Sequence, residues 1–326
     1  MHAIRLHAFG PPENLVYEDV EDPRPGPGQV RIAVAAAGVH LIDTTIRAGV
    51  QRGPMALPDL PSIPGREVAG TVDALGSGVD DAWLGRRVVA HLGPASGGYA
   101  ELAVRDVDAV HALPGAVAED EAVAMIGTGR TTLAILEVAA PTAGDVALVT
   151  SAAGGIGALL VQALRDAGAV TVGLVGSREK DARVRELGAT AVIDYTARDW
   201  TDGVRAALGD AQPTLAFDGV GGDVGRGALE LLAPGGRLIL YGFSSGEPTR
   251  LSAGDLLARG LTATGAIGPR ILNRPGGLRD LEEQALAALA EGRLVPLVQR
   301  FALADAAQAH AAIESRATVG KAVLVP

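Results

Sequence analysis

The segment "VALVTSAAGGIGALLVQALRDAG" (146–168) constrains the fold most, because a cluster of small residues joins two different hydrophobic patterns there. The apolar run at 146–150 predicts a buried strand, and the amphipathic run at about 155–167 predicts a helix. Between them, Ala152-x-Gly154-x-x-Gly157 is similar to the pattern G-x-G-x-x-G, with alanine in the first glycine position. A strand, a glycine turn and a helix in this order predict the start of a parallel α/β sheet.

The small residues of this turn suit a bound phosphate group. They allow a tight turn and close packing of the helix on the strand, and they let the backbone approach a pyrophosphate. The helix N-terminus adds unpaired N–H groups and the positive end of a dipole. We therefore predict a dinucleotide site rather than a purely structural turn, with cofactor contacts from Ala153, Gly154, Gly155, Ile156 and Gly157.

The rest of the chain changes its pattern twice. Residues 1–120 hold short apolar runs interrupted by Pro and Gly, which predict a β-rich region with long loops. From about 120, apolar runs alternate with helical patterns, which predicts a parallel sheet. Its further strands are expected at 170–175, 191–194, 214–218, 237–242 and, as an edge, 261–266. After about 268 come helical patterns at 278–292 and 304–315 and a last strand, "KAVLVP". Residue pattern alone leaves open whether this tail returns to the first region.

Composition excludes several classes of protein. The chain has 326 residues, a net charge of −10 and no cysteine. Nucleic acid is therefore not the expected partner, and disulfides and Cys-ligated zinc are excluded. The start "MHAIRLHAFG" is typical of a strand rather than of a signal peptide, and no apolar stretch of about 18 residues lacks charges or turn residues. We expect a cytoplasmic globular protein that spans no membrane.

The second expected strand is followed by residues that bear on the choice between NADH and NADPH. About twenty residues past the glycine turn, NAD enzymes place an acid on the ribose 2′-hydroxyl. This chain has Ser177 there, followed by Arg178 and Lys180. A hydroxyl and cations suit a 2′-phosphate, which a carboxylate would repel. The prediction is NADPH, although Arg178 and Lys180 are also compatible with solvated residues at a helix start.

Together these segments resemble the zinc-free quinone oxidoreductase (zeta-crystallin-like) branch of the medium-chain dehydrogenase/reductase superfamily, over nearly the whole chain. The similar stretches are "PGPGQVRIAVAAAGVHLIDTTIRAG", "PSIPGREVAGTVDALGSGV", "AAGGIG", "SREKDARVRELGATAVIDY", "LAPGGRLILYGFSSG" and "IESRATVGKAVL". The resemblance implies a GroES-like β-rich outer domain formed by both chain ends, 1–122 and 268–326. A Rossmann domain with a doubly wound parallel sheet, 123–267, is inserted between them.

The resemblance also implies roles for particular residues. Lys180, Tyr195 and Arg316 occupy the family's positions for holding the 2′-phosphate, which strengthens the prediction of NADPH. Thr131 matches a family threonine next to the nicotinamide. The loop that closes over the cofactor corresponds to Gly242, Phe243 and Ser244. Relatives often form homodimers by pairing an edge strand of each Rossmann sheet, which here is "LTATGA" (261–266).

A catalytic metal is not expected. His40 stands where zinc-dependent members of the superfamily have a Cys ligand, but Arg66 replaces their His ligand in "PGREVAG". A fixed cation beside a metal ion is electrostatically unfavourable. Asp43 and Arg47 lie four residues apart and are expected to pair.

Without a metal, the expected substrates are quinones or other α,β-unsaturated carbonyl compounds. Hydride addition to such an acceptor moves negative charge onto an oxygen that needs only hydrogen bonds or a proton. At the substrate end, His40 replaces the family's usual Asn, and Thr45 its usual Tyr. We hypothesise that His40 bonds or protonates the acceptor oxygen; alternatively it only fills the Asn site. An enoyl-thioester reductase and an NADPH-binding structural or sensing protein remain as alternative functions.

Overall fold

The computed structural model describes residues 1–51, 56–93 and 96–326, which form two compact units. The first unit comprises Met1–Gly127 and Ala285–Pro326, and the second comprises Thr128–Gln284. The sequence predicts both boundaries between the two domains earlier in the chain, at 122/123 and 267/268. One helical run, Glu119–Ala139, passes the first boundary and helix α10 (Gly277–Ala290) passes the second, so neither boundary coincides with a break in the pattern.

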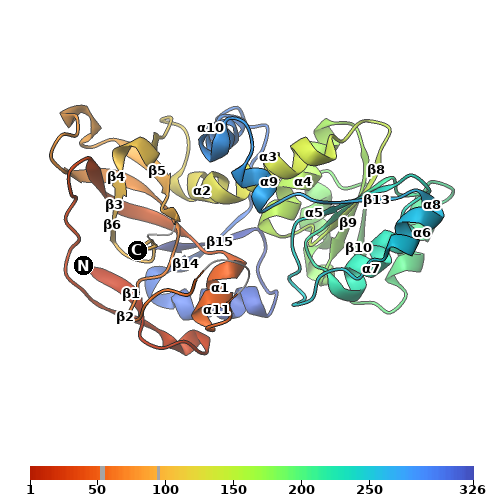
Figure 1. Ribbon diagram of the computed structural model, residues 1–326, viewed down its shortest axis with the longest axis horizontal. Coiled ribbons are helices and arrows are strands. Elements are labelled where there is room, and N and C mark those ends of the chain that lie inside the picture. Colours follow the sequence, from red (N-terminus) through yellow and green to blue (C-terminus); the bar gives the residue numbers. More distant parts are fainter. Residues whose placement is uncertain (52–55, 94–95) are drawn as a thin grey trace. The chain divides into compact units, whose positions relative to one another are not determined.

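A mostly antiparallel sheet builds the first unit from both ends of the chain (Figure 1). Its strand order is β14-β15-β3-β4-β5-β7, with β6 also paired to β3. The C-terminal strand β15 pairs antiparallel with β3, Val323 opposite Gly38. That pairing closes the outer domain that the sequence pattern had left open.

The strands of this sheet are β3 (Gln29–Gly38), β4 (Glu67–Leu75), β5 (Arg87–His91), β6 (Leu102–Asp106), β7 (Val110–Ala112), β14 (Val298–Ala302) and β15 (Lys321–Val325). A separate hairpin-like pair joins β1 (His2–Leu6) to β2 (Leu15–Asp19). The helices are α1 (Leu41–Arg47), α2 (Glu119–Ala124) and α11 (Ala306–Glu314). Alternate residues of the strands form one apolar core with the buried ring of Tyr99.

The second unit is a six-stranded parallel sheet in the order β10-β9-β8-β11-β12-β13. The chain starts at β8, runs outward through β9 and β10, and then returns to the other side of β8. This order is that of a doubly wound Rossmann fold, whose switch point lies between β8 and β11. The predicted α/β architecture, a GroES-like domain with a Rossmann sheet, is confirmed.

The strands of the second unit are β8 (Val146–Thr150), β9 (Val170–Val175), β10 (Ala191–Asp194), β11 (Leu215–Asp218), β12 (Arg237–Leu240) and β13 (Thr262–Gly265). The helices are α3 (Arg130–Ala139), α4 (Gly155–Asp166), α5 (Asp181–Glu186), α6 (Trp200–Leu208), α7 (Gly222–Leu231), α8 (Ala253–Arg259) and α9 (Pro269–Leu272). A π-helical turn, η5 (Met125–Gly129), precedes α3.

Both faces of the parallel sheet are covered by helices (Figure 1). In β8, Ala147 and Val149 pack into the core that α3 and α4 cover, whereas Leu148 packs into the opposite core with α6 and α7. All three side chains are fully buried. Because successive strand residues point to opposite faces, a strand covered on both sides reads as a continuous apolar run.

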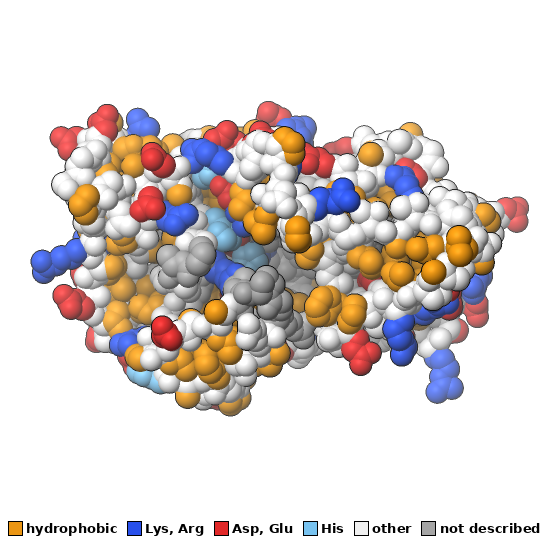
Figure 2. All heavy atoms as spheres, in the orientation of Figure 1, with side chains coloured by type: hydrophobic (Ala, Val, Ile, Leu, Met, Phe, Trp, Pro, Cys, Tyr) orange, Lys and Arg blue, Asp and Glu red, His pale blue; other side chains and the backbone are white. Residues whose placement is uncertain are grey.

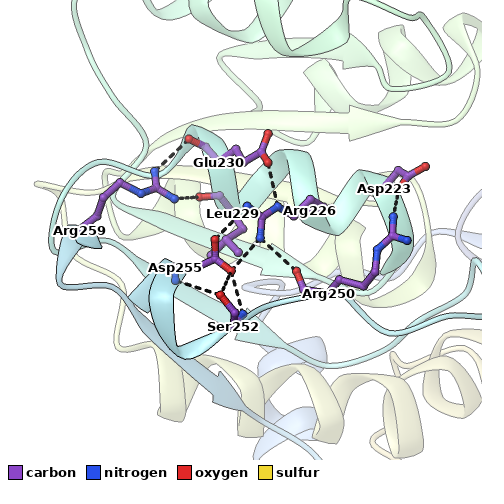
Figure 3. Close-up of polar contacts among 8 residues, drawn as sticks. All are labelled: Asp223, Arg226, Leu229, Glu230, Arg250, Ser252, Asp255 and Arg259. Atoms are coloured by element: carbon purple, nitrogen blue, oxygen red, sulfur yellow. Dashed lines mark hydrogen bonds and ion pairs between the residues drawn. The ribbon is translucent and has the colours of Figure 1, made fainter. Parts of the chain in front are cut away.

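Helix α8 is anchored to α7 by the polar contacts in Figure 3. Ser252 caps the helix, and its hydroxyl and the Asp255 carboxylate form a reciprocal capping box. Arg226 of α7 reaches Asp255 through two bonds of 2.9 Å and Glu230 through one of 2.8 Å. Arg259 donates to the last carbonyl groups of α7. These contacts place the segment that leads into β13.

One helical run of the described residues, Glu119–Ala139, is long and apolar enough to cross a membrane by length and composition alone. Its most apolar window has a mean hydropathy of 1.3, and 67% of that window is buried inside the structure. The core helix of a soluble protein meets the same criteria, so this run is weak support for a membrane span.

Candidate functional site

The glycine turn of the second unit lies at the carboxyl end of the central strand β8. Ser151 takes a left-handed conformation (φ 52°), after which Ala152 N–H bonds to Leu174 of β9 at 3.0 Å. Helix α4 then begins at Gly155. A Cβ added at Gly157 would stand 2.8 Å from Ala152 Cα, so only glycine lets α4 pack this closely on the turn. The backbone therefore has the form that a pyrophosphate site needs.

Three of the predicted cofactor residues come together at the ends of the next two strands. Tyr195 N–H bonds to Val175 at 2.9 Å, which fixes the end of β10 against the end of β9. A Cβ at Gly176 would lie 2.8 Å from the Tyr195 hydroxyl, so that hydroxyl lies over the backbone just before Ser177. Lys180 follows in the turn η6 (Arg178–Lys180), where its N–H bonds to the Ser177 carbonyl at 3.2 Å. No carboxylate stands at Ser177, the position where NAD enzymes place an acid.

The loop at Gly242, Phe243 and Ser244 is tied to the loop that follows β11. Ser244 N–H bonds to the Gly219 carbonyl at 3.0 Å, and the Phe243 side chain is partly exposed. Both loops follow strands of the parallel sheet, so they lie at the same carboxyl edge as the glycine turn. Thr131 lies in the first turn of α3 in the same unit and is half-buried.

Asp218 orders this edge, and sequence reasoning missed it. The fully buried carboxylate accepts hydrogen bonds from Val220 N–H and Gly221 N–H at 3.0 Å and from the Thr150 hydroxyl at 3.2 Å. The Thr249 hydroxyl donates to its second oxygen. One charged group thus connects the end of β8 with two loops. An acid ending an apolar strand, followed by three glycines within four residues (Gly219, Gly221 and Gly222), was the available signal.

The remaining predicted residues, His40, Thr45 and Arg316, belong to the first unit. Arg316 follows α11 with a positive φ of 59° and is exposed. Thr45 is half-buried in α1, and its hydroxyl lies 3.4 Å from the Leu41 carbonyl. Because Arg316 lies in one unit and Lys180 and Tyr195 lie in the other, their joint role at a 2′-phosphate stays a prediction.

His40 forms the buried ion-pair cluster of the first unit together with Glu67 and Lys321. His40 Nε2 lies 2.7 Å from Glu67 Oε2, and Lys321 Nζ lies 2.9 Å from the same oxygen. The Glu67 side chain is fully buried, whereas that of His40 is 23% exposed. Burial by itself raises the pKa of the Glu67 carboxyl, but the charges of His40 and Lys321 outweigh it and hold the pKa well below its usual range.

A second buried network joins α1 to α11. The Tyr99 hydroxyl donates to Asp43 at 3.1 Å and lies 3.2 Å from Nε2 of the fully buried His310. Burial raises the pKa of Tyr99, and Asp43 raises it further. The expected pair of Asp43 with Arg47 is wrong. Asp43 lies 3.5 Å from Arg66, and Arg47 bonds to Glu314 and to the Gly10 carbonyl, because the buried Arg47 turns toward α11.

The parallel sheet, its switch point and its glycine turn define a dinucleotide-binding protein. Two family models match the chain: "Alcohol dehydrogenase GroES-like domain" over residues 26–115 and "Zinc-binding dehydrogenase" over residues 155–291. A quinone oxidoreductase of Pseudomonas aeruginosa is 33% identical over 99% of both chains. A 2-haloacrylate reductase of a Burkholderia species is 32% identical over 99% of this chain and 98% of its own.

Solved structures agree with these relatives. The quinone oxidoreductase of Escherichia coli, crystallised with NADPH, has a TM-score of 0.87 and 29% identity over all of both chains. A mycobacterial protein, also solved with NADPH, has a TM-score of 0.86 and 32% identity over all of both chains. The chain belongs to the quinone oxidoreductase branch of the medium-chain dehydrogenase/reductase superfamily, as the sequence predicted, and is an oxidoreductase.

Proposed function

We propose that this oxidoreductase transfers hydride from NADPH to quinones or other α,β-unsaturated carbonyl compounds without the help of zinc. The names of its relatives support the acceptor class, since they include quinone oxidoreductases and a 2-haloacrylate reductase. The acceptor of a 2-haloacrylate reductase is a conjugated double bond next to a carboxyl group. The observation that carries the proposal is the His40–Glu67–Lys321 cluster, in which His40, at the position of a zinc ligand in zinc-dependent members, is paired with a buried carboxylate that an ammonium group also contacts.

The cofactor is NADPH, and the residues of the second unit fit it. The turn from Ala153 to Gly157 brings backbone N–H groups and the start of α4 to the pyrophosphate. Ser177, Lys180 and Tyr195, with Arg316, are proposed to hold the 2′-phosphate. Residues proposed at the nicotinamide end are Thr131, Gly242, Phe243 and Ser244. When bound, NADPH supplies the hydride.

The donor atoms at the His40 position do not suit a zinc ion. A tetrahedral zinc site takes His, Cys or carboxylate ligands that are free to coordinate. Glu67 is already engaged by His40 and by the Lys321 ammonium at 2.9 Å, and Arg66 places a guanidinium near Asp43. Within the part of the chain that the structure describes, no group of three or more His, Cys, Asp or Glu side chains is arranged to hold a metal. Catalysis here is proposed to rest on hydrogen bonding and proton supply instead.

A conjugated acceptor matches these groups chemically. Hydride arrives at the ring or the β-carbon, and the negative charge moves onto the acceptor oxygen. His40 is proposed to bond that oxygen or to supply its proton, and Thr45 to line the acceptor end in place of the family's Tyr. The protein's further tasks are to orient the two reactants and to exclude water.

An acceptor screen tests this function. NADPH oxidation at 340 nm would be followed with 1,4-benzoquinone, an alkyl enone and an enoyl thioester, with NADH run beside NADPH and with EDTA or zinc added. We expect turnover with the quinone or the enone, a preference for NADPH, and rates indifferent to EDTA and zinc. Turnover confined to enoyl thioesters would establish the thioester reductase instead. Tight NADPH binding without turnover on any acceptor would establish a binding or sensing protein.

We also propose a homodimer formed through β13. This strand ends the order of the parallel sheet, and Thr262 and Gly265 are exposed at its two ends. Nearby helices carry apolar side chains into solvent, with Leu257 84% and Leu272 67% exposed. Pairing of two β13 strands about a twofold axis would satisfy their ladder groups and cover apolar surface. Light scattering should give twice the 33.0 kDa chain mass, and Thr262→Lys should favour the single chain; a 33.0 kDa species at micromolar wild type would refute the dimer.

The remaining partner predictions are retained with this proposal. On the face drawn in Figure 2, basic side chains of the described residues are interspersed with acidic ones. Such a surface, with a net charge of −10, is not that of a nucleic-acid-binding protein. A cytoplasmic location and the absence of membrane association stay predictions, which cell fractionation would test.

A further inference from the structure

His40, Glu67 and Lys321 form a buried cluster of an imidazole, a carboxylate and an ammonium group. One carboxylate oxygen, Glu67 Oε2, meets a cation or imidazole on two sides, at 2.7 Å and 2.9 Å. Of the three side chains, only His40 is substantially open to solvent, at 23%, against 0% for Glu67 and 5% for Lys321. The buried Glu67–Lys321 ion pair therefore contacts the His40 imidazole on the side that faces away from solvent.

Backbone packing encloses this carboxylate. Glu67 starts β4 beside Gly38, the last residue of β3, where a Cβ would collide with Oε2 and lie 3.1 Å from Lys321 Cε. A Cβ at Gly127 would collide with Glu67 Oε1 and lie 3.3 Å from His40 Cε1. Two glycines thus give the carboxylate its place, and neither could carry a side chain without displacing it.

The chemistry of the His40–Glu67 pair determines which of the two side chains carries the proton. Glu67 is ionised because His40 and Lys321 outweigh the effect of burial on its pKa. A carboxylate only accepts hydrogen bonds, so the nitrogen facing it at 2.7 Å, Nε2, carries a proton. Nε2 is itself buried and lies within ion-pair distance of Glu67 Oε2, so solvent does not compete with Glu67 at this nitrogen.

We infer that Glu67 is a positioning residue that acts through His40: it fixes the imidazole ring and keeps a proton on Nε2, so that His40 meets the acceptor through its other ring nitrogen. Lys321 balances the charge of Glu67 and keeps the carboxylate ionised. This inference rests on the proposed function for the identity of the acceptor. It goes beyond that function because it assigns a role to two residues that do not touch the substrate.

The arrangement defines the proton transfer. As hydride from NADPH reaches the acceptor carbon, an electron pair moves onto the acceptor oxygen. The N–H bond at the outer nitrogen of the imidazolium breaks, its electron pair stays on nitrogen, and an O–H bond forms on the acceptor. His40 is left neutral with its remaining proton still on Nε2, facing the Glu67 carboxylate, and a proton from solvent reloads the outer nitrogen. Glu67 stabilises the imidazolium throughout, as the carboxylate of a catalytic triad does.

Charged groups from several elements act on His40. Glu67 approaches from β4 and Lys321 from β15, and His91 of β5 acts on Glu67 electrostatically. Asp43 of α1 accepts the His40 backbone N–H at 2.8 Å and lies 3.5 Å from Arg66. A pH profile of the wild type therefore reports the whole group, so variants at Glu67 and Lys321 are needed to isolate the contact with His40.

A double-mutant cycle separates positioning from simple stability. Glu67→Gln keeps the size of the side chain and removes its charge, and His40→Asn removes the imidazole. Purified E67Q, H40N, E67Q/H40N and wild type would be assayed for kcat and KM with NADPH and 1,4-benzoquinone. We expect E67Q to lower kcat by about tenfold or more in the wild-type background and by less than twofold in the H40N background. Equal losses in the two backgrounds would overturn the inference.

Two further measurements keep the test decisive if E67Q folds poorly. Lys321→Met leaves Glu67 to His40 alone, so the pH profile of kcat should differ from that of wild type as long as His40 is present; an unchanged profile counts against Glu67 acting through His40. Nitrogen-15 NMR of the His40 ring in wild type should show a proton on Nε2. A ring with its proton only on Nδ1 would overturn the inference without any turnover, whereas failure of every acceptor would refute the proposed function alone.

Discussion

The glycine turn supplies the most direct test of the cofactor site, through Gly157→Ala. The added methyl would stand 2.8 Å from Ala152 Cα and 2.9 Å from the Ser151 carbonyl carbon. Both neighbours are backbone atoms, and Ser151 already lies in the left-handed region with φ 52°. The collision therefore has no flexible side chain to displace, and either the start of α4 or the turn after β8 must shift.

The sign of the effect follows from two opposing contributions. Alanine favours a helix over glycine by about 1 kcal/mol. Overpacking of a close contact costs about 1–3 kcal/mol, and backbone against backbone belongs at the upper end, at about 3 kcal/mol. We expect Gly157→Ala to lose about 2 kcal/mol of stability. Since α4 would no longer present its N–H groups at the same place, NADPH should bind about tenfold more weakly or worse.

The matched control is Gly203→Ala, in the middle of α6 in the same unit. A Cβ there meets only Ile193, at 3.6 Å and 3.7 Å, which are ordinary contacts. This variant should gain up to about 1 kcal/mol and bind NADPH as wild type does. Urea unfolding and fluorescence titration with NADPH measure both effects. A Gly157→Ala protein as stable as Gly203→Ala, with unchanged NADPH affinity, would refute the account of the turn.

Three other changes have expected outcomes. Asp218→Ala should destabilise the protein by about 3 kcal/mol or more in urea, because it leaves two backbone N–H groups and two hydroxyls without their buried acceptor; a loss under 1 kcal/mol would contradict that reasoning. Burial lowers the pKa of His310 from 6.5 to about 4, so the unfolded chain takes up the proton first as pH falls. The free energy of unfolding therefore has its full value above pH 6.5 and falls by about 3 kcal/mol as the pH is lowered to 4. His310→Gln should remove that part of the decline in urea curves recorded at several pH values, and an identical slope would refute it. Lys180→Ala should raise the Kd for NADPH about tenfold or more and leave that for NADH unchanged, since the ion pair proposed for Lys180 is with the 2′-phosphate; equal weakening of both would show that Lys180 does not discriminate.

Local sequence rules identified much of the second unit. The expected strands at 170–175 and 191–194 coincide with β9 and β10, and the turn at Gly154 opens α4 as predicted. Helix α8 was not expected, although Ser252 and Asp255 at capping-box spacing were a signal for it. Helix α6 was also missed, because an aromatic residue, Trp200, and a mid-helix glycine weaken its pattern.

The sequence by itself determined the parts of this protein that depend on neighbouring residues. The turn at Ser151–Gly157 needs small residues for local steric reasons, and the absence of an acid at Ser177 follows from the same strand–turn spacing. Only the tertiary structure decided how His40, Glu67 and Lys321 combine. His40 precedes α1 and Glu67 starts β4, whereas Lys321 starts the C-terminal strand β15. The pairing of β15 with β3 and of β3 with β4 brings their charges together. The energy of a buried charge depends on which partners the fold places within about 3 Å, and spacing along the chain does not encode that.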